Sequence, residues 1–201
     1  METPALTPET TTAPQLAAPG AGLPGPERFV GNLILRWQSW RTPRAGAETL
    51  FAAQRARVLE LVDRCDPGKR ATPVLIPRLR GMEDSSRFWS VLMTVDHLRI
   101  VNHQITTVIT SLAAGQVPAR RGSTAAVKPD PRADGSVVAR FEAVNDAFIQ
   151  AVAAIPDLKT QARFAHPWFG PLHAAQWHFL AGFHMRLHVR QMEAILAGLG
   201  A

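Results

Sequence analysis

The sequence has one cysteine, few acidic residues and no long apolar run, and each shortage excludes a class of protein. With Cys65 alone, no intrachain disulfide can form, which fits a reducing compartment. No apolar stretch approaches the roughly 20 residues that span a bilayer. The first residues also lack the basic start and apolar middle of a secretory signal. We therefore expect a cytoplasmic protein with no membrane partner.

The scarcity of acids leaves a basic chain. Sixteen Asp and Glu residues face 22 Lys and Arg residues, so the formal net charge is +6. Such a balance raises the question of nucleic acid or anionic surfaces as partners. The basic residues are spread from Arg28 to Arg190 without a run of five or six, and no nucleic-acid-binding motif is present. We expect a solvated basic surface and no nucleic-acid partner.

Large apolar side chains are also scarce at the N-terminus, although 46% of the whole chain is hydrophobic. Residues 1–25 are mostly Thr, Pro, Ala and Gly, which cannot bury enough surface to offset the entropy of ordering. The composition predicts a disordered tail over residues 1–25 and one folded domain over residues 26–201.

Apolar residues recur at helical spacing in five segments of that domain. The predicted helices are residues 26–41, 47–65, 84–114, a segment centred on 141–155, and 171–199. Between them lie an extended connection at 67–83, a long loop at 115–136 and a loop at 166–170, and residues 74–76 could form a strand that has no obvious partner. The pattern predicts an all-α fold, a four-helix bundle with an additional N-terminal helix.

The last predicted helix carries two histidines that can share a metal ion. His184 and His188 are spaced i, i+4, so both imidazoles lie on one helix face. Leu180 and Ile195 lie on the same face, which indicates that the histidines replace core residues. A buried imidazole needs a hydrogen bond or a ligand. Taken alone, the spacing fits a metal site or two histidines satisfied by neighbouring side chains.

A third histidine comes from the helix predicted at 84–114. His97 lies near its middle on an otherwise apolar face, and facing helices of a bundle can bring such residues to one point. Three neutral imidazoles leave at least one coordination position open, as in catalytic zinc sites. Gln104, two turns beyond His97, and Gln191, seven residues beyond His184, are expected to orient the ligands or bound water.

Two segments resemble a known family. The segment WSVLMTVDHL at residues 89–98 resembles the second helix of DinB-like proteins, and residues 177–192, which contain HMRLHVRQ, resemble their last helix. That family pairs one histidine of its second helix with a His-x-x-x-His in its fourth, and His97, His184 and His188 match these positions. The resemblance covers roughly residues 46–199.

The resemblance implies a DinB-like bundle that binds one divalent ion, nickel or zinc, with iron or manganese as further options, and that often forms a homodimer. It places the chain near enzymes that use low-molecular-weight thiols. The implied function is a metal-dependent enzyme that activates water or a thiol for thiol transfer, isomerisation or hydrolysis of a small-molecule substrate. The alternative is a non-catalytic dimeric binding or sensing module with a structural metal or a histidine network.

Three more aromatic residues are candidates for the pocket, and two further histidines are not. His173 either lines the mouth of the cavity or serves the start of the last helix, and His166, in the loop before it, approaches the pocket if the family's loop is kept. Trp177 is a further pocket candidate, although such tryptophans are more often core. His103 and His178 fall off the ligand face.

Overall fold

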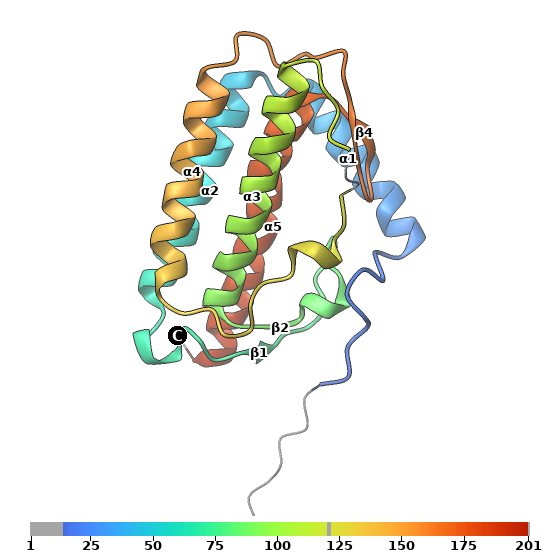
Figure 1. Ribbon diagram of the computed structural model, residues 1–201. Coiled ribbons are helices and arrows are strands. Elements are labelled where there is room, and N and C mark those ends of the chain that lie inside the picture. Colours follow the sequence, from blue (N-terminus) through green and yellow to red (C-terminus); the bar gives the residue numbers. More distant parts are fainter. Residues whose placement is uncertain (1–13, 120–121, 201) are drawn as a thin grey trace, which may run out of the picture.

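Helices dominate the structure, a computed structural model that describes residues 14–119 and 122–200. Within these residues the chain forms five α-helices: α1 (Gly25–Arg41), α2 (Arg44–Arg64), α3 (Val91–Ala113), α4 (Ser136–Ala153) and α5 (Ala174–Leu199). Helices α2 to α5 run side by side as a bundle, and α1 lies to one side of them (Figure 1). The prediction of an all-α four-helix bundle with an additional N-terminal helix is confirmed.

Helix α3 starts seven residues later than the sequence pattern predicts. The hydroxyl of Ser90 accepts a hydrogen bond from the backbone N–H of Met93 at 3.1 Å, which caps the helix. Before the cap, residues Asp84–Ser86 form a single 3-10 turn and Phe88–Trp89 form a strand. The absence of proline and glycine from residue 84 onward therefore permitted a helix there but did not start one.

Two small antiparallel sheets flank the bundle in the described part of the chain. Strand β1 (Val74–Leu75) pairs with β2 (Phe88–Trp89), and β3 (Phe164–His166) pairs with β4 (Gly170–Leu172). The strand predicted at residues 74–76 thus has a partner, and the loop predicted at residues 166–170 is a hairpin. The second hairpin also delays the start of α5 from Pro171 to Ala174. Strands of two or three residues are too short to show an alternating pattern in sequence.

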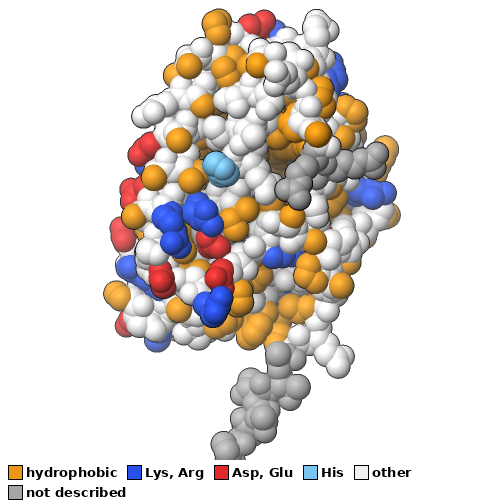
Figure 2. All heavy atoms as spheres, in the orientation of Figure 1, with side chains coloured by type: hydrophobic (Ala, Val, Ile, Leu, Met, Phe, Trp, Pro, Cys, Tyr) orange, Lys and Arg blue, Asp and Glu red, His pale blue; other side chains and the backbone are white. Residues whose placement is uncertain are grey.

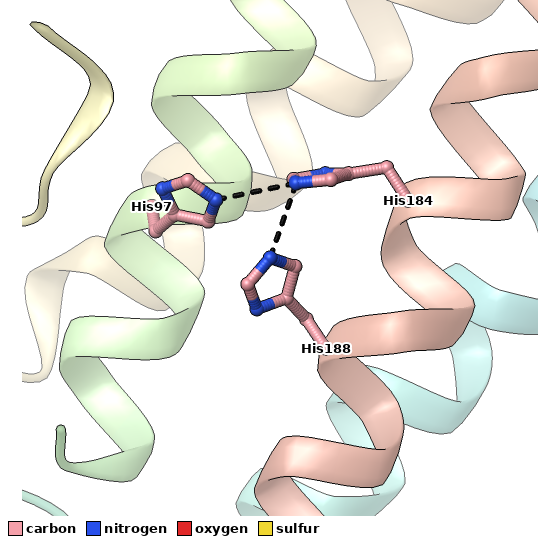
Figure 3. Close-up of side chains that lie close together, drawn as sticks. All are labelled: His97, His184 and His188. Atoms are coloured by element: carbon pink, nitrogen blue, oxygen red, sulfur yellow. Dashed lines mark hydrogen bonds between the residues drawn. The ribbon is translucent and has the colours of Figure 1, made fainter. Parts of the chain in front are cut away.

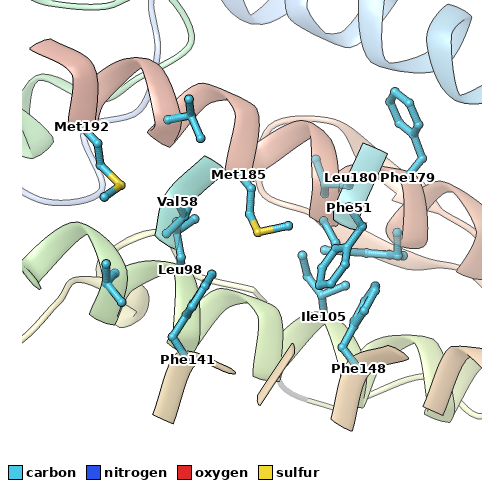
Figure 4. Close-up of a cluster of buried hydrophobic side chains, with 14 of the residues drawn as sticks. Phe51, Val58, Leu98, Ile105, Phe141, Phe148, Phe179, Leu180, Met185 and Met192 are labelled. Atoms are coloured by element: carbon cyan, nitrogen blue, oxygen red, sulfur yellow. The ribbon is translucent and has the colours of Figure 1, made fainter. Parts of the chain in front are cut away.

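The core lies between the apolar faces of α2, α3, α4 and α5. Phe51 of α2 and Phe148 of α4 are fully buried and stack with ring centroids 4.2 Å apart. Figure 4 shows Leu98 and Ile105 of α3 and Met185 of α5 among the same buried side chains. Burial of side chains of this size contributes about 1.5–3 kcal/mol each. This packing holds α3 and α5 in the relative position on which the site depends.

A glycine allows α2 and α5 to approach closely. A Cβ atom at Gly182 would lie 2.9 Å from Cγ of Leu50 and 3.0 Å from the backbone nitrogen of Phe51. Distances this short do not occur between well-packed atoms, so the helices can meet here only around a residue without a side chain.

Helix α1 is attached to the bundle by one face only. Leu35 is completely buried, and Arg36 donates a hydrogen bond to the carbonyl of Phe169 at 3.0 Å. The outward face carries exposed apolar side chains, namely Phe29 (73% exposed), Leu33 (62%), Trp37 (54%) and Trp40 (80%). On the face shown in Figure 2, hydrophobic atoms predominate on the right, toward α1, and charged side chains gather on the left.

The segment before α1 has no helix or strand where it is described, over residues 14–24. The backbone N–H of Ala17 donates to the carboxylate of Asp84 at 2.8 Å, and that of Gly20 donates to Glu83 at 3.3 Å. Residues 1–13 of the predicted disordered tail lie outside the described residues. None of the described helices combines the length and hydropathy needed to cross a membrane.

Candidate metal centre

Three imidazole rings converge between α3 and α5. Nε2 of His184 lies 3.3 Å from Nε2 of His97 and 3.1 Å from Nε2 of His188 (Figure 3). A divalent ion bound to imidazole nitrogens at about 2.0–2.1 Å requires these nitrogens to be roughly 2.8–3.4 Å apart for octahedral or tetrahedral angles. Both separations from His184 therefore fit a shared ion, and the candidate ligand atoms of all three residues lie within 4.8 Å of one another. The three residues that the sequence pattern selected as ligands are brought together.

The tautomer of His97 is set by a backbone carbonyl. Nδ1 of His97 lies 2.6 Å from the carbonyl oxygen of Val127, in the connection between α3 and α4. Because a carbonyl oxygen can only accept a hydrogen bond, Nδ1 carries the proton and its N–H group is the donor. Nε2 of His97 consequently presents a lone pair to the centre of the cluster, as a metal ligand must.

Gln191 sets the tautomer of His188 in the same way. The side-chain Nε2 of Gln191 donates to the carbonyl of Ser86 at 2.7 Å, which fixes the orientation of the amide. Its Oε1 therefore faces Nδ1 of His188, 2.6 Å away, and accepts a hydrogen bond from the Nδ1–H group. Nε2 of His188 is left with a lone pair that also points into the cluster.

The third ring, His184, cannot satisfy both lone pairs by itself. A neutral imidazole carries one N–H, so His184 can donate to His97 or to His188 but not to both. Its Nδ1 is buried and has no hydrogen-bond partner among the described residues. A cation at the centre would accept all three lone pairs at once, so the donor set fits a metal ion better than a closed hydrogen-bond network.

Burial keeps the three rings neutral. It lowers the pKa of His97 to about 4, and it lowers the pKa values of His184 and His188 well below the ordinary value, with further lowering of each by the neighbouring rings of the cluster. A proton therefore does not compete for these nitrogens near neutral pH, and the lone pairs remain available to a metal.

Trp89 covers one side of the cluster. Its ring lies nearly parallel to that of His188, with centroids 6.0 Å apart, and 5.1 Å from the ring of His97. The small sheet places it there, since Trp89 ends strand β2. The sequence pattern predicted a helix at this position, because a two-residue strand gives no sign of itself in a sequence.

A buried ion pair anchors the connection that carries Val127. Lys128 donates to Glu83 at 3.1 Å and to the hydroxyl of Ser86 at 3.0 Å, and Thr124 donates to Glu83 at 2.8 Å. Burial raises the pKa of Glu83, but the hydrogen bonds from Thr124 and Lys128 outweigh it, so the pKa is lowered and the carboxylate stays ionised. The pair thereby holds both carbonyls, those of Ser86 and Val127, that fix the imidazoles. No sequence pattern pointed to it.

The histidine cluster borders a cavity of about 720 Å³. Val101 and Ile105 of α3 form one wall, and Leu180 and Leu187 of α5 form another. Ile34 of α1 contributes to the lining as well. The additional N-terminal helix therefore helps to enclose the space beside the cluster. Cavities of this size and apolar character are typical of small-molecule sites.

Of the other residues predicted to lie in or near the pocket, three line the cavity and one lies outside its lining. His166, Trp177 and Gln104 line the cavity, but Gln104 is exposed and its side chain forms no hydrogen bond to a described residue. His173 is absent from the lining. It is the residue before α5, and its backbone N–H donates to Gln176 at 3.2 Å, which fits the helix-start alternative.

His166 is neutral and has a defined tautomer. Its Nδ1 accepts a hydrogen bond from the backbone N–H of Trp168 at 3.1 Å, and burial lowers its pKa to about 3. Its proton consequently lies on Nε2. Of the two histidines expected off the ligand face, His103 is exposed, and His178 is buried beside Phe148.

Comparisons with known proteins agree with this architecture. A solved structure described as a crystal structure of TT2238, a four-helix bundle protein, matches with a TM-score of 0.57 and 22% sequence identity, over 76% of this chain and 99% of that chain. At this identity the match shows a common fold. A search of curated proteins found no match. Residues 50–192, well over half of the sequence, match the DinB superfamily, so the resemblance seen in the histidine segments is confirmed and the chain belongs to that superfamily.

Proposed function

We propose that this protein is a metal-dependent enzyme in which His97, His184 and His188 hold one divalent ion, nickel or zinc. The observation that carries the proposal is the convergence of three Nε2 atoms at the edge of a large cavity. Two of these atoms have their lone pairs directed inward by outer partners, Val127 and Gln191. Outer partners of this kind accompany metal-ligating histidines and fix their orientation.

A divalent ion bound there would lower the pKa of a coordinated water or thiol and supply hydroxide or thiolate near neutral pH. The protein's own residues orient and shield that chemistry. The carbonyl of Val127 and the amide of Gln191 hold two rings in place, and Trp89 excludes water from one side. The reaction classes that fit are thiol transfer, thiol-assisted isomerisation and hydrolysis.

His166 is the polar side chain best placed to assist. It lines the same cavity as His184. With Nδ1 occupied by the N–H of Trp168, its Nε2–H is the group it offers to a bound substrate. We propose that this N–H donates a hydrogen bond to a substrate oxygen.

The test compares an open coordination site with a closed one. Protein loaded with Co²⁺ in place of its own metal is titrated with 2-mercaptoethanol, and the absorption spectrum is recorded. The proposal expects a new thiolate-to-cobalt charge-transfer band that is absent from the His184→Ala variant. An unchanged spectrum in a protein that holds cobalt would instead support the alternative, a binding or sensing module with a structural ion.

We further propose that two copies of the chain meet through α1. Phe29, Trp37 and Trp40, which are 73%, 54% and 80% exposed, together leave roughly 450 Å² of aromatic surface in water. This is more than half of the about 800 Å² that each partner buries in a standard interface. Exposed apolar surface of this extent on one helix is typical of an interaction site.

A further inference from the structure

The cavity lining carries more positive than negative charge. Five cationic side chains contribute to it, namely Arg78, Arg80, Lys128, Arg186 and Arg190. Two carboxylates, Glu27 and Glu83, stand against them. The four arginines are exposed, so they lie at the rim, whereas the histidine cluster lies deeper.

Both carboxylates are already neutralised. Glu27 pairs with Arg78 at 2.7 Å and also accepts the backbone N–H of Gly81. Glu83 pairs with Lys128 at 3.1 Å, and its side chain is only 3% exposed. Neither carboxylate is free to pair with the other cations of the lining.

Three arginines of the rim remain without an ion pair among the described residues. Arg80 and Arg190 form none, and Arg186 donates to the neutral side chain of Gln38 at 3.3 Å. Their guanidinium groups offer paired donors that match a carboxylate, phosphate or sulfonate. A positive rim also raises the local concentration of anions and repels cations.

Much of the rest of the lining is apolar. Ile105 of α3 and Leu180 of α5 line the space and are buried. Val30 and Ile34 of α1, which are partly open to solvent, line it together with Phe183 and Leu187 of α5. An inorganic anion would gain nothing from these walls, and a polar metabolite would lose hydration there without compensation. The walls suit a hydrocarbon or aromatic body.

We infer that the cavity binds an amphipathic organic anion, with its acidic group at Arg80 and Arg190 and its apolar body against α1 and α5. This ligand class is the substrate class of the proposed enzyme, and in that respect it rests on the proposed function. In this orientation the far end of the apolar body approaches the histidine cluster, and the acidic group remains near solvent.

The inference is tested with three probes that share one chain length and differ in charge: dodecanoate, dodecan-1-ol and dodecyltrimethylammonium, each below its aggregation limit. Isothermal titration calorimetry is done on the full-length, metal-free protein, so that no carboxylate can bind a metal. We expect dodecanoate to bind about tenfold more tightly than dodecanol at low ionic strength, with the ratio falling as salt is added, and the cation to bind most weakly. Equal or tighter binding of dodecanol would overturn the inference.

Matched variants separate the effect of the rim arginines on binding from the effect of the protein's net charge. The Arg80→Glu/Arg190→Glu double variant should lose about tenfold in affinity for dodecanoate and keep its affinity for dodecanol. The Arg64→Glu/Arg140→Glu double variant, with the same net charge change at two exposed positions outside the cavity lining, should keep both affinities. Equal losses in the two double variants would contradict a rim site. The Ile34→Gln variant should weaken both probes to a similar extent, and tighter binding of either would contradict the assigned apolar wall.

Failure of this inference and failure of the proposed function give different results. Anion-selective binding by a protein that takes up no metal would reject the metal centre and keep the ligand class. Metal uptake with no preference for the anion would reject the ligand class and keep the metal centre.

Discussion

Gln191 is the residue whose role is most sharply defined by its contacts. Completely buried on α5, it accepts a hydrogen bond from Nδ1–H of His188 and donates one to the carbonyl of Ser86. It therefore links His188 to the segment that precedes α3. Loss of its amide would leave the Nδ1–H of His188 without a partner and the ring free to rotate.

We predict that Gln191→Leu weakens metal binding about 10- to 100-fold, because the outer partner of a ligand histidine fixes its tautomer and orientation. The matched control is Gln104→Leu, since Gln104 is exposed and its side chain bonds to no described residue. Competition with a chelator of known affinity measures both variants. If the Gln191→Leu variant bound the metal as tightly as the wild type, Gln191 would not have the proposed role of positioning His188.

His178 predicts a pH dependence of stability. It is 1% exposed, and burial lowers its pKa to about 4, with a further lowering by Arg44 and an opposing effect of Glu48. As the pH falls from 6.5 toward 4, the unfolded chain takes up a proton at this residue and the folded chain does not. The free energy of unfolding should fall over this range, by up to about 3 kcal/mol from His178.

The His178→Leu variant should therefore show a flatter dependence of stability on pH between about 6.5 and 4 than the wild type. Urea unfolding at a series of pH values, in a metal-free buffer, measures the slope. His103→Leu removes an exposed histidine and serves as the control. A slope in the His178 variant as steep as that of the wild type would show that this ring does not carry the effect.

At the residue scale, the three histidines that converge could be predicted from sequence and their surroundings could not. His184 and His188 identify themselves by helical spacing, and His97 by its place on an apolar face. The groups that orient them include the carbonyls of Ser86 and Val127. Every residue has a carbonyl, so no residue type marks these positions.

Among the elements, the contact of α2 with α5 makes a specific prediction. Gly182→Ala adds one Cβ that would lie 2.9 Å from Leu50, and the variant should lose about 2 kcal/mol of stability through forced separation of the helices. Gly135→Ala is the control, because a Cβ there meets nothing within 4 Å. Chemical unfolding compares the two. If the Gly182→Ala variant kept the wild-type free energy of unfolding, the helices would be able to separate there at little cost.

The exposed apolar side chains of α1 lead to a prediction about dimer formation. The Phe29→Gln/Trp40→Gln double variant should be monomeric under conditions in which the wild type is dimeric, because it removes two of the most exposed apolar side chains. Ile149→Gln, which alters an exposed apolar residue of α4 (43% exposed), should remain dimeric. Sedimentation equilibrium measures the mass of each. A monomeric wild type would reject the proposed dimer.

The helices were the most predictable elements, since each carries apolar residues that recur over several turns. Helices α2 to α5 bury them in the core, whereas α1 buries only Leu35 and leaves most of its apolar side chains exposed. Their ends were less so: α3 begins at the Ser90 cap and not at residue 84, where the pattern first allows a helix. The partner of the strand expected at residues 74–76 and the whole of the β3–β4 hairpin were missed, because these strands hold only two or three residues. These strands supply Trp89 and His166, so the pattern failed at elements that shape the site.

At the scale of the whole molecule, the helices both assemble the histidine cluster and enclose the cavity beside it. Packing of α3 against α5 brings the three imidazoles together, and α1 lies over the adjoining space so that the cluster borders a lined cavity. The sequence predicts the histidine cluster through its helical spacing. It does not predict the cavity, because the cavity depends on where α1 packs against the bundle.

The central claim is that one divalent ion binds to His97, His184 and His188. Elemental analysis of untagged protein tests it most directly, with the wild type beside alanine variants of each ligand and of His103, the exposed histidine of α3. We predict about one equivalent of nickel or zinc in the wild type and in His103→Ala, and its loss from all three ligand variants. A wild type that takes up no ion, or ligand variants that keep it, would contradict the account.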